Sequence, residues 1–288
     1  MSGLPKSCCA TGSLHTGTPT GSEEKLHDRD VYVARPPAGT KPKGIVVIIP
    51  DIFGWTLPNN RILADEFAIK GSYLVYLPDF MHGWIFPSSM LASVDAMNET
   101  GLVANVMKAY HVACLIRYFA PIMYFNPLKK IKPEVETFFK EVRQHEDTKH
   151  LPVGAAGYCW GGYFTLQLAA DTVRTDVGRP LIDAAYTAHP SFLTVPADIE
   201  NVKLPLSIAQ SEIDPQMPKA KAMTTKEILE KKNAEAKDGV KHEFVYYDGA
   251  HHGFAVRANE KDVEEAEMGK KAEKQAIDWY QRWFAQLR

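Results

Sequence analysis

The segment at 157–162, Gly-Tyr-Cys-Trp-Gly-Gly, has the residue types and spacing of a nucleophile site. It follows an apolar run at 151–156 that predicts a strand, and it opens a helical pattern at 163–170. This is the nucleophile-elbow pattern G-x-S-x-G, with Cys159 in the serine position. Glycines allow the tight turn from strand into helix because they have no Cβ to collide. A helix N-terminus favours thiolate over thiol, so Cys159 is predicted to be a nucleophile for acyl transfer, with the Trp160 N–H facing the developing oxyanion.

An elbow nucleophile needs an acid and a base, which follow it along the chain in that order. The predicted strand at 204–209 ends shortly before Glu212 and Asp214. Acids at the carboxyl end of a parallel strand lie where such folds place their sites, so both are candidates. The alternative for each is a loop acid or the N-cap of the helix that follows.

The candidate base comes after the last predicted strand, 242–247. The chain there reads Asp248, Gly, Ala, His251, His252. Asp248 is explained by an Asp-Gly turn. One histidine of the pair is predicted to be the base of a Cys-His-acid triad.

The elements that position these residues predict an α/β fold. Continuous apolar runs at 44–49 and 72–77 are typical of strands covered on both faces, whereas 30–35 alternates and indicates a half-exposed edge strand. Other strand-like runs lie at 151–156, 184–188, 204–209 and 242–247, and helical patterns lie at 59–70, 217–237 and 260–287. The alternation implies a mostly parallel sheet of about seven or eight strands with helices on both faces.

Residues 30–288 are predicted to form one domain, preceded by an extended N-terminal segment at 1–29. The stretch 80–150 is much longer than the roughly 12 residues that a crossover needs, and it contains an aromatic run at 118–125. We predict an inserted helical segment here. It is either an extra layer with its own small core or a cap over a hydrophobic pocket.

Composition excludes several classes of protein. Thirty-three basic and 35 acidic side chains among 288 residues leave a net charge of −2, too little to attract nucleic acid or an anionic membrane. No apolar run reaches the roughly 18–20 residues of a membrane span, and the N-terminus lacks a signal-peptide core, so we expect a soluble, cytoplasmic protein. The four cysteines form no C-x-x-C pair, and neither a metal nor an organic cofactor is expected.

These motifs together resemble the dienelactone hydrolase (carboxymethylenebutenolidase-like) family of α/β-hydrolases. The resemblance covers most of residues 30–288. It is closest to the fungal branch, which shares Cys8-Cys9 and the Ala188-His189-Pro190-Ser191 turn. It implies hydrolysis of a small-molecule ester or lactone. The protein is expected to be either a monomer or a homodimer.

The resemblance also implies roles for particular residues. The family aspartate precedes a proline by four residues, which selects Asp214, and the family histidine precedes a small residue and phenylalanine, which selects His252. The family segment acid-Ile-Phe-Gly begins here at Asp51, so the N–H groups of Ile52 and Trp160 would form the oxyanion hole.

Two departures from the family pattern concern activation and specificity. The family acid that contacts the resting thiol is glutamate, whereas Asp51 is one methylene shorter. The two arginines that hold a substrate carboxylate are not reproduced. One would lie just after Asp79, where the chain continues with Phe80, and the other would lie at Val256, one residue before Arg257. The further candidates for the substrate pocket are Tyr158, Trp84, His189 and Arg257.

Three other functions fit the same residues. A non-catalytic binding protein would keep the fold with an inert Cys159. A redox sensor would oxidise that thiol, with Cys8 or Cys9 as the resolving cysteine. An esterase for a larger hydrophobic ester would use the aromatic side chains of the inserted segment.

Overall fold

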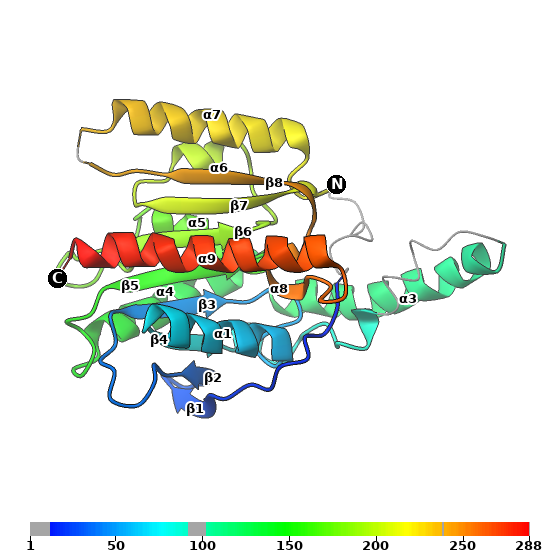
Figure 1. The fold of residues 1–288 in the computed structure, drawn as a ribbon, viewed down its shortest axis with the longest axis horizontal. Coiled ribbons are helices and arrows are strands. Elements are labelled where there is room, and N and C mark those ends of the chain that lie inside the picture. The colour runs from blue at the N-terminus through cyan, green and yellow to red at the C-terminus, as the bar shows by residue number, and fades with distance from the viewer. Residues whose placement is uncertain (1–11, 92–101, 238, 288) are drawn as a thin grey trace.

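The computed structural model describes residues 12–91, 102–237 and 239–287, and their strands form one eight-stranded sheet (Figure 1). The strand order is β1-β2-β4-β3-β5-β6-β7-β8. The strands are β1 (Ser22–Leu26), β2 (Arg29–Ala34), β3 (Ile45–Ile49), β4 (Leu74–Pro78), β5 (Val153–Tyr158), β6 (Ala184–Ala188), β7 (Leu206–Ile213) and β8 (Glu243–His251). Strands β3 to β8 are paired in parallel, and β1 and β2 are antiparallel. The predicted fold class is confirmed.

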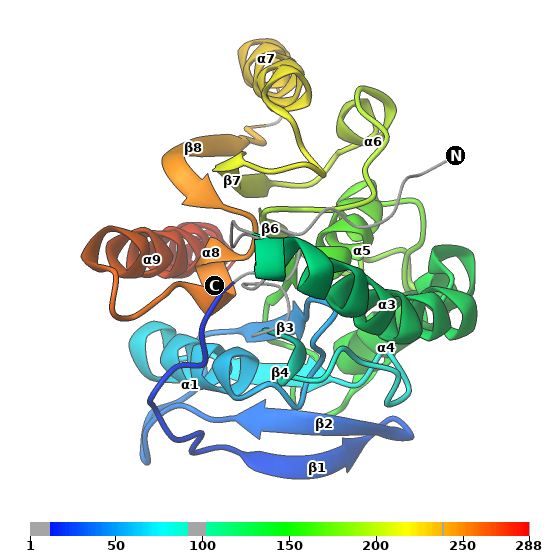
Figure 2. The same ribbon diagram turned by 90° about the vertical axis from the view of Figure 1, so that its right-hand side faces the viewer.

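Helices cover both faces of this sheet (Figure 2). Helices α1 (Pro58–Gly71) and α9 (Val263–Ala285) lie on one face, and α4 (Leu128–Gln144) and α5 (Trp160–Ala169) lie on the other. Helices α6 (Ala197–Glu200) and α7 (Lys219–Glu235) lie toward the β7–β8 end, and α8 (Phe254–Arg257) precedes α9.

Helix α9 is fastened to the centre of the sheet by buried tyrosines. The small residues of β5 let it approach closely, since a Cβ on Gly154 would lie 2.4 Å from the Tyr280 ring. Tyr280 Oη donates to Ala155 O at 2.6 Å, and Tyr186 Oη donates to Ala272 O at 2.9 Å. Helix α9 therefore packs directly against β5, the strand that leads to Cys159.

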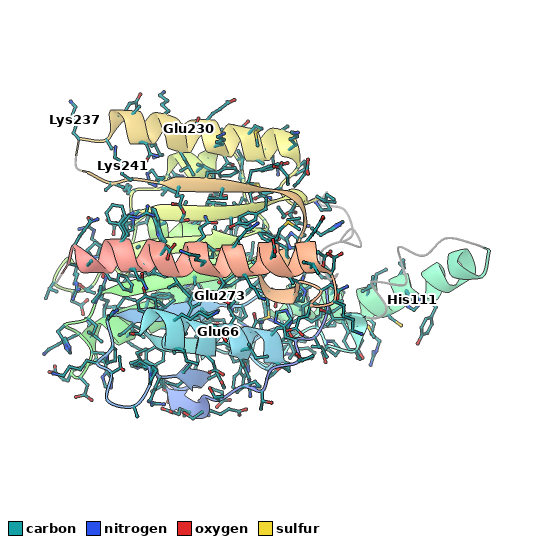
Figure 3. The ribbon with its side chains drawn as sticks, in the orientation of Figure 1. Glu66, His111, Glu230, Lys237, Lys241 and Glu273 are labelled. Carbon is teal, nitrogen blue, oxygen red and sulfur yellow. The ribbon has the colours of Figure 1, made fainter. Side chains whose placement is uncertain are left out.

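An exposed ion-pair cluster joins α9 to α1 on the same face. Lys70 of α1 lies 2.7 Å from Glu66 and 2.6 Å from Glu273 of α9 (Figure 3). The cluster contributes little to stability because solvent screens it.

The prediction that residues 30–35 form a half-exposed edge strand was wrong. The corresponding strand, β2, lies between β1 and β4, and its residues 31–34 are buried. The actual edge is β1, whose sequence Ser-Glu-Glu-Lys-Leu lacks an apolar alternation. Charged side chains on an edge strand prevent further strand pairing. The N-terminal segment thus supplies a strand of the sheet, while Cys8 and Cys9 lie outside the described residues.

Among the described residues of the stretch 80–150, helices α3 (Leu102–Phe125) and α4 have different surroundings. Helix α4 belongs to the layer that covers the sheet, whereas α3 projects away from it (Figure 1). The C-terminal half of α3 is anchored by Leu115 and Ile122, which are buried. Within the described part of the chain, no helix combines the length and apolarity needed to cross a membrane.

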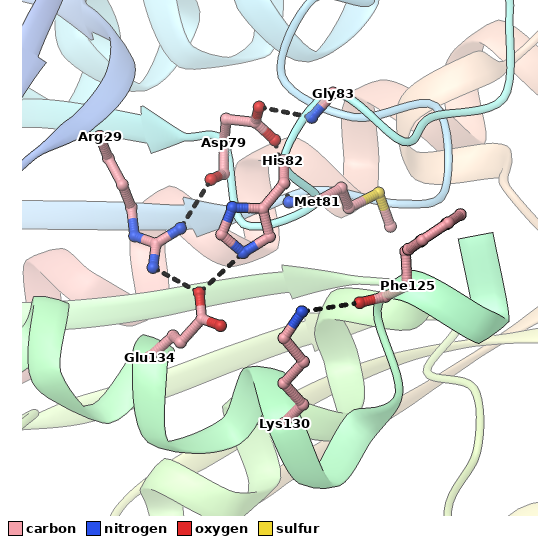
Figure 4. Close-up of polar contacts among 8 residues, drawn as sticks. All are labelled: Arg29, Asp79, Met81, His82, Gly83, Phe125, Lys130 and Glu134. Carbon is pink, nitrogen blue, oxygen red and sulfur yellow. Dashed lines mark hydrogen bonds and ion pairs between the residues drawn. The ribbon is translucent and has the colours of Figure 1, made fainter. Parts of the chain in front are cut away.

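An ionic network attaches the loop after β4 to α4 (Figure 4). The Glu134 carboxylate lies 2.6 Å from an Arg29 guanidinium nitrogen and 2.8 Å from His82 Nε2. The same loop continues to Phe86, whose N–H donates to Ile52 O at 2.8 Å. The loop therefore connects the inserted segment with the segment that follows β3.

The buried tyrosine contact yields a stability prediction. Replacement Tyr280→Phe removes the buried hydrogen bond to the Ala155 carbonyl, which keeps its partner in the β5–β6 ladder, and is expected to lower the free energy of unfolding by about 0.5–1.5 kcal/mol. Urea unfolding followed by circular dichroism measures this. The matched control is Tyr124→Phe, because Tyr124 is 79% exposed and the change is expected to stay within about 0.5 kcal/mol. Equal effects of the two changes would contradict the prediction.

Candidate active site

The candidate residues lie at the carboxyl ends of four neighbouring strands. Cys159 follows β5, His189 follows β6, Asp214 follows β7 and His252 follows β8. Backbone hydrogen bonds join these ends: Cys159 N–H donates to Ala188 O at 3.3 Å, His189 N–H to Ala209 O at 2.9 Å and His252 N–H to Ile213 O at 3.2 Å. The parallel pairing therefore brings residues that are far apart in the sequence to one edge of the sheet.

The turn at Cys159 has the strained geometry expected of an elbow. Its φ is 51° and its ψ is −111°, and the residue is 2% exposed. A Cβ on Gly161 would lie 2.0 Å from Ile49 O, and a Cβ on Gly157 would lie 2.1 Å from Thr165 Oγ1. Both positions require glycine, because a Cβ atom cannot approach another heavy atom this closely. Helix α5 can begin beside the end of β3 only with these glycines.

His252 and Asp214 form a buried hydrogen-bonded pair. His252 Nδ1 lies 2.9 Å from Asp214 Oδ2, and neither side chain is exposed. Ser211 Oγ donates to the same carboxylate oxygen at 2.9 Å, and Gln216 N–H donates to Oδ1 at 2.9 Å. A neutral imidazole that donates from Nδ1 carries its basic lone pair on Nε2. The carboxylate thus fixes both the orientation of the ring and its tautomer.

The electrostatics of the pair favour a charged carboxylate. Burial alone would raise the pKa of Asp214, but the charge and hydrogen bond of His252 outweigh burial and hold that pKa below its usual range. Asp214 therefore stays ionised and stabilises an imidazolium on His252.

The structure distinguishes the two candidate acids and the two candidate histidines. Glu212 accepts a hydrogen bond from Gly249 N–H at 2.8 Å instead of contacting a histidine ring. His251 is exposed, whereas His252 is buried against Asp214. The pair selected by the family resemblance is the pair that the fold brings together.

The two residues whose N–H groups are expected to bind an oxyanion are Trp160, at the start of α5, and Ile52, in the segment after β3. Trp160 is the first residue of α5, so its N–H has no acceptor within the helix. A Cβ on Gly161 would lie 2.0 Å from Ile49 O and 2.9 Å from Pro50 O, so the start of α5 packs closely against the chain just before Ile52. The Ile52 carbonyl is held by the Phe86 N–H, which fixes the orientation of its peptide segment.

Asp51 and Arg257 are bound to each other. Their side chains form a buried ion pair in which Arg257 Nη1 contacts Asp51 Oδ2, and neither side chain is exposed. Asp51 Oδ1 also accepts from Phe53 N–H at 3.1 Å and Asn60 Nδ2 at 3.2 Å. The Arg257 guanidinium lies 4.8 Å from the centre of the Phe53 ring. The pair connects residues 51–54, which we call the oxyanion segment, to helix α8, which begins two residues after His252. A structural role accounts for both Asp51 and Arg257.

The other predicted pocket residues are divided between the buried centre and the inserted segment. His189 is fully buried, with its ring centre 4.8 Å from that of His252 and 6.1 Å from that of Tyr158. Burial lowers the pKa of His189 well below its usual range, and the His252 charge lowers it further. Trp84 is partly exposed and stacks on Phe125 of α3 with ring centres 4.2 Å apart.

Sequence reasoning missed two serines at the site. Ser191 Oγ lies 3.4 Å from Cys159 Sγ, and Ser211 supports Asp214. Ser191 belongs to the turn directly after β6, and its place at a strand end beside the elbow strand was the signal that could have identified it. Among the described residues, no group of three or more histidine, cysteine or acidic side chains is arranged to hold a metal ion.

Comparison with known proteins gives concordant results. A sequence model of the dienelactone hydrolase family matches residues 30–287. The chain is 30% identical over 285 residues to hydrolase tropI of Talaromyces stipitatus, covering 98% of each protein. It is 24% identical to dienlactone hydrolase 1 of Gibberella moniliformis, covering 96% of this chain and 94% of that one. A putative dienelactone hydrolase from Klebsiella pneumoniae has the same fold, with a TM-score of 0.62 at 19% identity over 93% of this chain and 98% of that one.

The buried ion pair yields a second prediction. Replacement Arg257→Met leaves the Asp51 carboxylate buried without its counter-charge and is expected to lower the free energy of unfolding by about 3–5 kcal/mol. The control is Arg35→Met, since Arg35 is 55% exposed in its pair with Glu24 and the expected loss is at most about 1 kcal/mol. Urea unfolding measures both. Similar small losses for both variants would show that the Asp51–Arg257 pair is not needed for stability.

The lowered pKa of Asp214 predicts a pH dependence of stability. The unfolded chain binds the Asp214 proton first as pH falls, because its aspartate pKa is the higher one, about 3.9. The stabilisation from the carboxylate is therefore complete above that value and is lost as pH falls below it. The difference in free energy of unfolding between wild type and Asp214→Asn is expected to be smaller at about pH 3 than at about pH 5. Urea titrations at the two pH values measure this, and a difference that grows toward low pH would contradict it.

Proposed function

The chain belongs to the dienelactone hydrolase family and is a carboxylic ester hydrolase, and we propose that it cleaves lactones or small activated esters through an acyl-cysteine intermediate on Cys159. One observation carries the proposal. The buried Asp214–His252 pair, with Nδ1 and Oδ2 2.9 Å apart, lies at the same edge of the sheet as an elbow cysteine. This arrangement has the parts of a nucleophile, a base and an orienting acid.

In the first half-reaction, His252 accepts the proton of the Cys159 thiol. The sulfur attacks the substrate carbonyl carbon, and the C–O bond of the ester then breaks. The departing alkoxide takes the proton from the imidazolium. In a lactone, the leaving oxygen stays attached to the acyl chain, so the acyl-enzyme carries the opened ring.

In the second half-reaction, water attacks the thioester carbon while His252 takes a proton from the water. The C–S bond breaks, the departing sulfur takes the proton from His252 and the carboxylic acid leaves. Asp214 keeps the imidazole oriented and stabilises its charged form in both halves. Thiolate is a good leaving group, so the mechanism favours esters and lactones over amides.

The negative charge that develops on the carbonyl oxygen would be bound by the N–H groups of Ile52 and Trp160. A single donor of this kind is worth about 3–4 kcal/mol in other enzymes. Support for this role comes from the elbow packing, which sets the start of α5 against the end of β3. The ion pair of Asp51 and Arg257 holds the oxyanion segment in place rather than binding substrate.

A larger hydrophobic ester is the second candidate substrate. The Phe86 ring lies 5.7 Å from that of Phe53 and 6.1 Å from that of Tyr118, centre to centre. These rings join the oxyanion segment to α3 of the inserted segment. Because Arg257 is already neutralised by Asp51, it is not available to hold a substrate carboxylate. Both observations favour an uncharged acyl or alcohol group over the carboxylate of dienelactone.

The test compares the wild type with Cys159→Ala in hydrolysis of p-nitrophenyl acetate and of a small lactone. Wild type is expected to show a p-nitrophenol burst followed by steady turnover, because p-nitrophenolate is a good leaving group and acylation of Cys159 is then faster than hydrolysis of the thioester. Cys159→Ala is expected to lose both the burst and the turnover while keeping its melting temperature.

Cys114→Ala is the matched control, since Cys114 is a partly buried thiol on α3 and is expected to leave both signals unchanged. Turnover of Cys159→Ala at the wild-type rate would contradict the proposal. Equal background rates in all three proteins would instead favour the binding or redox function, which selective oxidation of Cys159 by peroxide would then separate.

A further inference from the structure

The hydroxyl of Ser191 is directed at the sulfur of the candidate nucleophile. Ser191 Oγ lies 3.4 Å from Cys159 Sγ, within hydrogen-bonding distance for sulfur, and either atom can be the donor. Ser191 is 1% exposed and Cys159 is 2% exposed, so the contact is shielded from bulk water. A hydrogen bond to sulfur in such surroundings is stronger than at the surface.

The backbone holds this hydroxyl in position. Ser191 N–H donates to the carbonyl of Cys159 itself at 2.9 Å, so the two residues are linked through both main chain and side chain. The preceding residue, Pro190, packs against the elbow, since a Cβ on Gly162 would lie 2.6 Å from Pro190 Cβ. The turn after β6 and the elbow after β5 therefore form one rigid unit.

Asp51, the acid that the family resemblance suggested as a partner of the thiol, is bound to other groups. The Asp51 carboxylate is saturated by Arg257, Phe53 N–H and Asn60. Among the described residues, the Ser191 hydroxyl is the side-chain group that the structure bonds to the Cys159 sulfur.

We propose that Ser191 is a further catalytic residue, which holds the Cys159 sulfur in position and donates a hydrogen bond to it once the thiol proton has moved to His252. The hydroxyl can serve both states because it is an acceptor as well as a donor. Before proton transfer it can accept from the thiol, and afterwards it donates to the sulfur anion. The same donation applies again when the thioester C–S bond breaks and the anion is released. This inference rests on the proposed use of Cys159 as a nucleophile.

The experiment uses two variants that differ in a single group. Threonine and valine have the same shape, but only threonine has a hydroxyl, so Ser191→Thr and Ser191→Val share any disturbance from the added methyl groups. Ser191→Ala is measured beside them, and Ser207→Ala is the control because Ser207 is a buried serine that bonds Glu243 at 2.9 Å. Each protein is checked for an unchanged circular dichroism spectrum.

Two rates are measured for each protein: alkylation of Cys159 by iodoacetamide, and the p-nitrophenyl acetate burst with its dependence on ester concentration. Ser191→Ala and Ser191→Val are expected to slow both rates by about tenfold, because a hydrogen bond to a charged group is lost. The ester concentration at half-saturation is expected to change less than about twofold, since substrate contacts are retained. Ser191→Thr is expected to retain most of both rates, and Ser207→Ala is expected to match wild type.

The inference is overturned if Ser191→Ala alkylates and bursts at wild-type rates, or if Ser191→Thr is as slow as Ser191→Val. The second outcome would show that shape, rather than the hydroxyl, matters at this position. If Ser191→Ala does not fold, the comparison of threonine with valine decides the question. Alkylation requires no hydrolysis, so slow alkylation of Ser191→Val in a protein without esterase activity would support the Ser191 contact while contradicting the proposed function.

Discussion

At Cys159 the chain turns from β5 into α5 with a φ of 51°, and the rest of the site is built around that turn. A positive φ is costly for a residue with a side chain, so surrounding contacts must hold it. Gly157 and Gly161 provide the room, while the hydrogen bond from Cys159 N–H to Ala188 O ties the turn to the next strand. The result is a buried thiol at the N-terminus of α5.

The other candidate residues are positioned by the parallel sheet and by one ion pair. Neighbouring strand ends deliver Asp214 and His252, and their mutual hydrogen bond fixes the imidazole. The Asp51–Arg257 pair spans 206 residues of sequence and fastens the oxyanion segment to the helix after His252. The candidate site is therefore stabilised by backbone hydrogen bonds between neighbouring strand ends and by an ion pair between two distant segments.

The sequence predicted the parts of the molecule that depend on local pattern. The elbow and the parallel strands follow from short-range periodicity and turn residues, whereas the selection of Asp214 over Glu212 and of His252 over His251 came from the family resemblance. Strand β1 was missed because its charged residues have no apolar alternation, and β2 was therefore placed at the edge. The engagement of Asp51 by Arg257, and the contact of Ser191 with Cys159, arise from tertiary packing between distant segments that no local pattern encodes.

The most direct measurement is the mass of the Cys159 peptide after acid quenching during turnover of p-nitrophenyl acetate. Acid quenching preserves a thioester, and digestion with mass spectrometry locates the acetyl group. The account predicts one acetyl group on Cys159 that accumulates during the burst and disappears when ester is exhausted. Steady hydrolysis with Cys159 unmodified, or with the acetyl group on another residue, would contradict the account.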